Sequence, residues 1–242
     1  MTVHQLFPTP GLAFDLTEPL ARDSFRSLLQ PGAPEWMRAT MVTTSGGNTA
    51  GPDGTSNSVT RGLDREILNL LRSLADGVVV GAGTLRVERI PYPTASPLVI
   101  LSARGDIATH NLVPTADGDD DLVVITTEQG IATAKEKLSG IRHRIFISPE
   151  ASPPEDLAQH IRHILGAGHL LIEGGPQVWK LLAPVTDDLW LAVVPPPSSN
   201  AEGMPGWWPR GSGDWELGSM FTDEAKMLYF LHRRLRGAPS KP

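Results

Sequence analysis

The sequence has no cysteine among its 242 residues. This absence excludes disulfide bonds, thiolate-bound zinc and a cysteine nucleophile. There is also no excess of basic residues, because 21 Lys and Arg stand against 27 Asp and Glu, which gives a net charge of −6. A basic face is what attracts the nucleic-acid backbone, so we expect no nucleic-acid partner.

The first eight residues have neither a basic start nor a long apolar stretch. We therefore expect no signal peptide and no membrane anchor. Together with the lack of cysteine, this favours a cytoplasmic protein. Because 40% of the residues are hydrophobic and only 20% are charged, we expect a packed core rather than disorder.

Several catalytic signatures are missing as well. The chain has no Gly-x-Ser-x-Gly sequence, so it does not support an α/β-hydrolase nucleophile. His160 and His163 lie one helical turn apart, but no third residue completes a zinc-binding pattern. A solvated helix face explains these two histidines better, and we expect no metal site.

The sequence does contain two apolar runs that each end in glycines before a helical pattern. They extend over residues 75–86 and 169–182. Such runs favour buried parallel strands, and glycines let the backbone turn sharply and approach a ligand closely. A helix that begins at such a turn directs N–H groups towards a phosphate. Two turns of this kind predict a bound nucleotide cofactor, and so an enzyme.

The two turns differ in how specific they are. After Gly81 and Gly83, Val87 stands where a Rossmann fingerprint needs its third glycine, so a Rossmann fold is not supported and a tight αβ connection is an equal alternative. The sequence Glu173-Gly174-Gly175-Pro176 is stronger, because it joins a carboxylate, two glycines and a proline suited to the first helical position. Its alternative is a helix start with a capping acid.

The chain alternates apolar runs with amphipathic stretches, which predicts an α/β fold. Strands are expected at residues 36–43, 77–80, 97–102, 121–127, 144–147 and 188–194, and helices at 63–74, 131–138 and 154–165. Residues 16–29 form an acidic amphipathic stretch. The segments around 217–221 and 226–233 predict an antiparallel finishing hairpin. We expect residues 1–34 to form an N-terminal extension packed on the domain, and residues 35–242 to form a single domain.

Four landmarks, taken in order, resemble the reductase domain of riboflavin biosynthesis, which is the C-terminal half of the bifunctional deaminase–reductase. They are the loop 53–56, the helix end 70–72, the turn 81–86 and the segment 171–176. The similarity covers about residues 36–195. It implies a dihydrofolate-reductase-like three-layer α/β fold with a mixed, mostly parallel central sheet and an antiparallel C-terminal hairpin. The zinc deaminase half is absent, which is consistent with the lack of cysteine.

The resemblance implies NADPH as the cofactor. Residues 175–181 match the family's diphosphate loop and helix start, and Thr84 and Glu88 match positions that line the cofactor. Ser102 matches a residue near the adenosine ribose phosphate, where Arg104 adds the cation that a 2′-phosphate needs. The predicted cofactor-binding residues are Thr84, Glu88, Ser102, Arg104, Gly174, Gly175, Pro176, Gln177 and Val178.

The substrate side matches the family only in part. Ser56, Arg72 and Glu173 match substrate contacts, with Arg72 directed to the ribosyl or ribityl phosphate, and no residue is assigned as catalytic. Three positions depart from the family's pattern: Gly46 replaces an aspartate, Thr40 a lysine, and Ser58 an aromatic residue. The later arginine of the family is also missing, and Arg86 or Arg89 is an alternative source of that charge.

The implied reaction is hydride transfer from C4 of NADPH to C1′ of an open-chain 5-amino-6-(5-phosphoribosylamino)uracil, a small-molecule substrate. The proton comes from solvent or from the pyrimidine itself. The alternatives are an NADPH-dependent reductase of another pyrimidine or a pterin such as dihydrofolate, and a non-catalytic nucleotide-binding paralogue. The family also implies a homodimer, with the loop around Trp207 and Trp208 as a candidate contact.

Overall fold

The computed structural model describes residues 1–116, 121–148, 152–194 and 215–235. The chain divides into two compact units. The first unit comprises Met1–Gln30, Thr40–Leu70 and Asp187–Pro242, and the second comprises Pro31–Ala39 and Leu71–Thr186. Each unit therefore draws on segments that are far apart in the sequence. Strand β3 (Trp36–Thr44) and helix α2 (Asp64–Arg72) contribute residues to both units.

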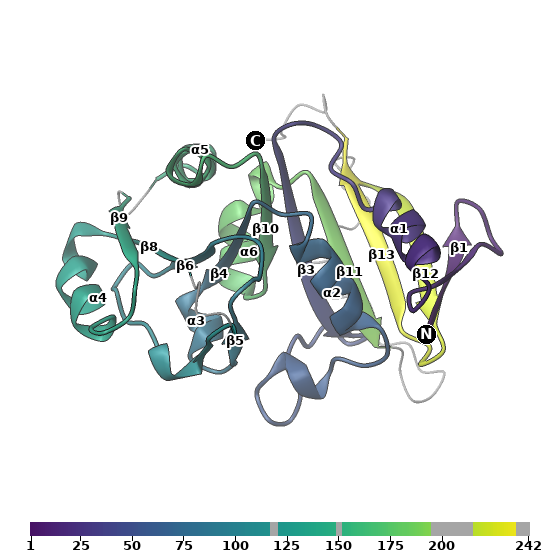
Figure 1. Cartoon of the computed structure of the whole chain (residues 1–242), viewed down its shortest axis with the longest axis horizontal. Coiled ribbons are helices and arrows are strands. Elements are labelled where there is room, and N and C mark those ends of the chain that lie inside the picture. Colours follow the sequence, from purple (N-terminus) through teal and green to yellow (C-terminus); the bar gives the residue numbers. More distant parts are fainter. Residues whose placement is uncertain (117–120, 149–151, 195–214, 236–242) are drawn as a thin grey trace. The chain divides into compact units, whose positions relative to one another are not determined.

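The second unit contains a parallel sheet whose strands alternate with helices (Figure 1). In order across the sheet, the strands are β10 (His169–Glu173), β4 (Gly77–Gly81), β6 (Leu98–Leu101), β8 (Leu122–Thr126) and β9 (Arg144–Ile147). The inner strands β4, β6 and β8 are made of Val, Ile and Leu and are buried almost throughout. Apolar side chains on both faces of a strand are what a parallel sheet covered by helices requires.

The connections of the second unit carry its helices. These are α3 (Ala82–Leu85), α4 (Ile131–Lys137), α5 (Pro154–Leu165) and α6 (Pro176–Leu182), with the short 3₁₀ turns η2 (Thr109–Asn111), η3 (Glu128–Gly130) and η4 (Ala183–Val185). A separate two-stranded pair is formed by β5 (Ile90–Pro91) and β7 (Leu112–Val113). Helix α5 ends at Gly166 in the left-handed conformation and packs against α6.

The first unit is built on an antiparallel sheet. Its strands are, in order, β2 (Ala13–Asp15), β1 (Thr2–Phe7), β12 (Trp215–Asp223), β13 (Leu228–Arg234) and β11 (Asp188–Val194). Helix α1 (Pro19–Leu28) packs on this sheet through Phe25, whose ring centroid lies 5.4 Å from that of Phe221 and 6.3 Å from that of Trp190. The unit also contains the 3₁₀ turn η1 (Ser56–Ser58). An aromatic core of this kind buries large apolar areas in few residues.

The α/β fold expected from the sequence is confirmed, with a parallel part and the antiparallel C-terminal hairpin β12–β13. The antiparallel part is larger than expected, because residues 2–7 and 13–15 form strands that the sequence analysis missed, and β1 pairs with β12. The amphipathic stretch at residues 16–29 contains helix α1, which begins at Pro19. The loop around Trp207 and Trp208 lies outside the described residues.

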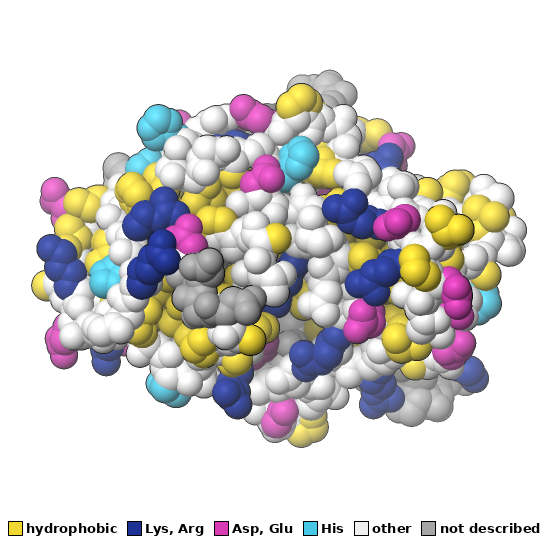
Figure 2. Space-filling view, in the orientation of Figure 1, with side chains coloured by type: hydrophobic (Ala, Val, Ile, Leu, Met, Phe, Trp, Pro, Cys, Tyr) yellow, Lys and Arg dark blue, Asp and Glu magenta, His cyan; other side chains and the backbone are white. Residues whose placement is uncertain are grey.

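Charged side chains of both signs are spread over the face drawn in Figure 2, with hydrophobic side chains exposed between them. On that face, Asp and Glu side chains lie among the Lys and Arg side chains of the described residues. In the described part of the chain, no helix combines the length and the apolar character needed to cross a membrane.

Candidate functional site

In the second unit, the two glycine turns follow the carboxyl ends of neighbouring strands. Strands β10 and β4 are parallel partners, and Ile172 pairs with Val79. Gly81 therefore leads from β4 into α3 beside the place where Gly174 and Gly175 lead from β10 into α6. Gly174 has φ = 67° and Gly175 has φ = 79°, values that side-chain-bearing residues rarely adopt. The carboxyl edge of a parallel sheet is the usual place for a ligand in this class of fold.

The two turns meet at Thr84. A Cβ placed on Gly175 would lie 2.8 Å from Thr84 Oγ1, and one placed on Gly174 would lie 3.8 Å from Thr84 Cγ2. A Cβ on Gly81 would lie 2.7 Å from Cγ2 of Val178, which is buried at the start of α6. Glycine is therefore needed at positions 81 and 175 for this close approach. The result is a surface of bare backbone next to one hydroxyl group.

Arg72 and Glu173, which the sequence predicts as separate substrate contacts, bind each other. Arg72 Nε donates to Glu173 Oε1 and Arg72 Nη2 donates to Glu173 Oε2, both at 2.5 Å. The two side chains are only 12% and 9% exposed. Burial alone would lower the pKa of Arg72, but the hydrogen bonds and charge of Glu173 raise it instead. The pair is therefore a buried ion pair in its charged form, placed directly before the Gly174–Gly175 turn.

Ser102 and Arg104 lie together on the turn that follows β6. Ser102 is buried, and its hydroxyl donates to Asp106 O at 3.3 Å, so it already has an internal partner. Arg104 is exposed on the same turn. The arrangement leaves Arg104 as the accessible cation of this turn.

The turn after β6 is hydrogen-bonded to the end of β8 and the loop that follows it. Ala103 O accepts hydrogen bonds from Thr127 Oγ1 at 2.7 Å and Thr126 Oγ1 at 3.3 Å. A Cβ on Gly105, which has φ = 68°, would lie 2.0 Å from Gly130 O. This close junction fixes the backbone that carries Arg104. This junction was not predicted from the sequence, although the two consecutive threonines at the end of β8 indicate side-chain hydrogen bonds there.

The remaining predicted cofactor residues lie near the same strand ends. Glu88 is half-buried just after α3, and its N–H donates to Thr84 O at 2.9 Å. Pro176 and Gln177 are exposed in the first turn of α6. Arg86, an alternative source of positive charge, is exposed and forms an ion pair with Asp106 at 3.6 Å.

Ser56 belongs to the first unit, in a loop that is folded on itself. Asp53 accepts hydrogen bonds from Thr55 N at 2.9 Å, Thr55 Oγ1 at 2.8 Å and Ser58 Oγ at 2.5 Å. The bond from Ser58, followed by those from Thr55, lowers the pKa of Asp53. Ser58 therefore shapes the loop that carries Ser56. Gly46 is exposed in the turn after β3.

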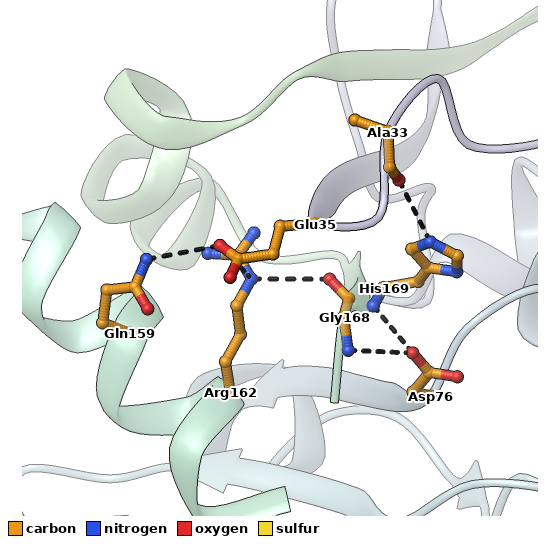
Figure 3. A network of polar contacts seen from close by, with 7 residues as sticks. All are labelled: Ala33, Glu35, Asp76, Gln159, Arg162, Gly168 and His169. Carbon is orange, nitrogen blue, oxygen red and sulfur yellow. Dashed lines mark hydrogen bonds and ion pairs between the residues drawn. The ribbon is translucent and has the colours of Figure 1, made fainter. Parts of the chain in front are cut away.

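A polar network fixes the opposite, amino ends of β4 and β10 (Figure 3). Asp76 Oδ2 accepts hydrogen bonds from the N–H groups of Gly168 at 3.0 Å and His169 at 2.8 Å, and the His169 ring contacts Ala33 O at 3.2 Å. Arg162 donates to Gly168 O at 3.4 Å. These bonds set the register of β10 against β4, and the register decides where the glycine turns meet.

Glu35 extends the same network on the side of α5 (Figure 3). It lies 3.9 Å from Arg162 Nε and accepts a hydrogen bond from Gln159 at 3.4 Å. Arg162 thus bridges Glu35 and the backbone before β10. Its role is structural, because it lies at the edge of the sheet away from the glycine turns.

Comparison with known proteins gives a family match and several solved structures of the same fold. The model of the RibD C-terminal domain family matches residues 35–195. A pyrimidine reductase-like protein from Corynebacterium diphtheriae is 20% identical, with a TM-score of 0.62, over 84% of this chain and 92% of the other. Riboflavin biosynthesis reductase Rib7 from Saccharomyces cerevisiae is 13% identical, with a TM-score of 0.61, over 88% of this chain and 99% of the other. At these identities the likeness shows a shared fold. No curated protein matches the chain.

A two-activity protein is also similar. The diaminohydroxyphosphoribosylaminopyrimidine deaminase/5-amino-6-(5-phosphoribosylamino)uracil reductase from Thermotoga maritima is 15% identical, with a TM-score of 0.59. The alignment covers 83% of this chain and only 57% of the Thermotoga protein. The present chain is thus similar to a part of that longer protein.

Proposed function

Because the chain belongs to the RibD C-terminal domain family, we propose that it is an NADPH-dependent oxidoreductase that reduces a phosphoribosylamino-pyrimidine of riboflavin biosynthesis. The observation that carries the proposal is the meeting of the two glycine turns at Thr84, within the segment that the family matches. A bare backbone surface beside a hydroxyl group suits a phosphate, since no Cβ keeps the ligand away.

The residues at these strand ends fit NADPH. The Gly174–Gly175 turn and the start of α6, with Pro176, Gln177 and Val178, would hold the diphosphate. Thr84 and Glu88 would line the adjoining part of the cofactor. Arg104 would meet the adenosine 2′-phosphate as a cation. Ser102 would position the turn that carries Arg104, because its N–H donates to Ile125 O and its hydroxyl donates to Asp106 O.

NADPH, when bound, supplies the hydride that reduces C1′ of the open-chain substrate. The chain's own residues bind the two ligands, orient them and keep water away from the reacting atoms. We assign no side chain as a general acid, since the proton can come from solvent or from the pyrimidine.

On the substrate side we propose Ser56, Arg72 and Glu173, with one restriction. Arg72 uses Nε and Nη2 for Glu173, which leaves Nη1 for a ligand phosphate. Gly46, Thr40 and Ser58 stand at positions where the family usually has other residues. All three residues belong to the first unit, where we expect any change of substrate preference to originate.

Two measurements test the proposal. The first is NADPH oxidation, followed by the loss of its near-ultraviolet absorbance, with 5-amino-6-(5-phosphoribosylamino)uracil and, separately, with dihydrofolate. We expect oxidation with the first substrate only. The second is a thermal shift with NADPH and with NADH. Turnover of dihydrofolate alone would favour the pterin reductase, and binding of NADPH with no turnover of either substrate would favour a non-catalytic nucleotide-binding protein.

The expected homodimer and the cytoplasmic location stay predictions of the sequence. So do the division into residues 1–34 and 35–242 and the lack of nucleic-acid and membrane partners. The mass of the purified chain in solution would test the dimer directly.

A further inference from the structure

We propose that Arg72 is a positioning residue that acts through Glu173 to hold the Gly174–Gly175 turn in its ligand-receiving conformation. In this role the Arg72–Glu173 pair supports the binding of the cofactor. The sequence predicts both residues as substrate contacts. The identity of the ligand rests on the proposed function. The restraint on the turn does not, because it can be measured in the ligand-free protein.

The Arg72–Glu173 pair lies directly before the glycine turn. Glu173 is the last residue of β10, and the next two residues are the glycines of the turn. Both oxygens of its carboxylate accept N–H groups of the same guanidinium at 2.5 Å. A bidentate pair of this kind fixes the direction as well as the position of the carboxylate. The backbone of residue 173 is therefore fixed where the turn begins.

The turn needs such a restraint. Glycine has more accessible backbone conformations than any other residue, and here two follow each other at φ values of 67° and 79°. On the helix side, Trp179 N donates to Gly175 O at 3.0 Å. On the strand side, the Arg72–Glu173 pair provides the corresponding anchor. With both ends held, the turn keeps Gly175 against Thr84.

Because Glu173 neutralises Arg72 and both side chains are about nine-tenths buried, the pair has no net charge, and only Nη1 of the guanidinium lies outside its two hydrogen bonds. Removing one partner would leave the other as an unpaired buried charge, which must become hydrated or move. Either response displaces residue 173, and the glycines that follow transmit the displacement. Removing both partners together avoids the unpaired charge.

The test compares Arg72→Gln, Glu173→Gln and the double variant by NADPH dissociation constants from direct titration. We expect each single variant to weaken NADPH binding on the order of tenfold or more, because small misplacements at a binding site have large effects. The double variant should bind better than the product of the two single effects predicts. Arg72→Lys, which keeps the charge but loses the bidentate geometry, should fall between the wild type and Arg72→Gln.

Amide hydrogen exchange of the ligand-free protein provides a readout that does not depend on NADPH. Exchange should become faster at Trp179, whose N–H donates to Gly175 O, in Arg72→Gln. The matched control is Arg144→Gln, which breaks the ion pair with Asp121 in the same unit, where both side chains are more than 40% exposed. This control should change neither NADPH affinity nor exchange at the turn. If Arg72→Gln does not fold, Arg72→Lys and the double variant carry the comparison.

Three results would overturn the proposal. Unchanged NADPH affinity with a raised KM for the pyrimidine would show that Arg72 acts on the substrate alone and does not restrain the turn. A lower melting temperature with unchanged affinity and unchanged exchange at the turn would make the pair merely stabilising. Additive effects in the double variant would show that the two residues act separately. A wild-type protein that does not bind NADPH would instead refute the proposed function, and the exchange result would still decide whether the pair restrains the turn.

Discussion

Gly175 is the residue where a single methyl group should disturb the candidate site most. Its φ is 79°, and an added Cβ would lie 2.8 Å from Thr84 Oγ1. We predict that Gly175→Ala weakens NADPH binding on the order of tenfold or more, because the turn must move to relieve the contact. The measurement is the NADPH dissociation constant by titration.

Gly140 provides the matched control for this prediction. It has φ = 80°, but a Cβ there would meet no atom within 4 Å. Gly140→Ala therefore introduces the same backbone strain, about 1 kcal/mol, without a close contact at the candidate site. Equal loss of NADPH affinity in both variants would show that a general loss of stability, rather than the contact with Thr84, is responsible.

Asp64 should make stability depend on pH in the acidic range. Burial, together with the nearby Asp223 carboxylate, raises the pKa of Asp64 from 3.8 to about 6, although Thr60 and Arg65 act in the opposite direction. The folded state therefore binds more protons than the unfolded state between these two values. Its stability should fall as the pH rises from about 4 to 6, by at most about 3 kcal/mol from this group.

The variant Asp64→Asn tests the direction of this pH dependence of stability. The difference in free energy of unfolding between Asp64→Asn and the wild type should shift in favour of the variant as the pH rises from about 4 to 7. Chemical unfolding at each pH measures it. A difference that stays constant, or that shifts towards the wild type, would contradict the raised pKa.

The glycine turns could be predicted from the sequence better than the side-chain contacts around them could. The glycines, Pro176 and Thr84 are recognisable because the sequence around each turn is local. The Arg72–Glu173 pair joins residues 101 positions apart, and no local pattern records such a contact. Ser102 is similar, since its bond to Asp106 O depends on how the turn folds.

At the scale of elements, Asp223 ties the start of α2 to the β12–β13 hairpin. Its carboxylate accepts hydrogen bonds from Leu63 N and Tyr229 OH, both at 2.8 Å, and from Met227 N at 3.0 Å. Burial and the contact with Asp223 raise the pKa of Tyr229, so the phenol stays protonated and keeps donating. Gly62 leaves room for this arrangement, since a Cβ there would lie 2.0 Å from Asp223 Oδ2.

We predict that Asp223→Ala lowers the free energy of unfolding by about 3–5 kcal/mol, because three buried donors lose their acceptor. Tyr229→Phe removes only one donor and should cost about 1 kcal/mol. Chemical unfolding measures both variants. Hydrogen exchange should become faster at Leu63 and Met227 in Asp223→Ala alone. Equal effects of the two variants would mean that Asp223 does not organise the junction.

Elements with a strong local pattern were predicted well. The helix at Pro154–Leu165 has the expected bounds, because proline marks its start and Gly166 its end. The strand at Gly77–Gly81 follows from three consecutive valines. Strands β1 and β2 were missed because Pro8, Pro10 and Gly11 interrupt the segment between them. Strand β1 pairs with β12, more than 200 residues away, and only that pairing makes it part of a sheet.

For the whole molecule, the sequence predicts both the family and the fold. The proposed cofactor and substrate residues are distributed over the two units. The second unit carries the glycine turns, Thr84, Arg104 and the Arg72–Glu173 pair. The first unit carries Ser56 and the positions that depart from the family's pattern. We expect substitutions in the second unit to change cofactor affinity, and those at Gly46 or Ser58 to change substrate preference.

The most direct test of the central claim is the fate of the hydride. The protein is incubated with NADPH deuterated at nicotinamide C4 and with 5-amino-6-(5-phosphoribosylamino)uracil, and the product is analysed by mass spectrometry. We expect a ribitylamino product that carries deuterium at C1′ when the transferred position is labelled. A protein that binds NADPH but forms no such product, or a product whose C1′ stays unlabelled with either C4 isotopomer, would contradict it.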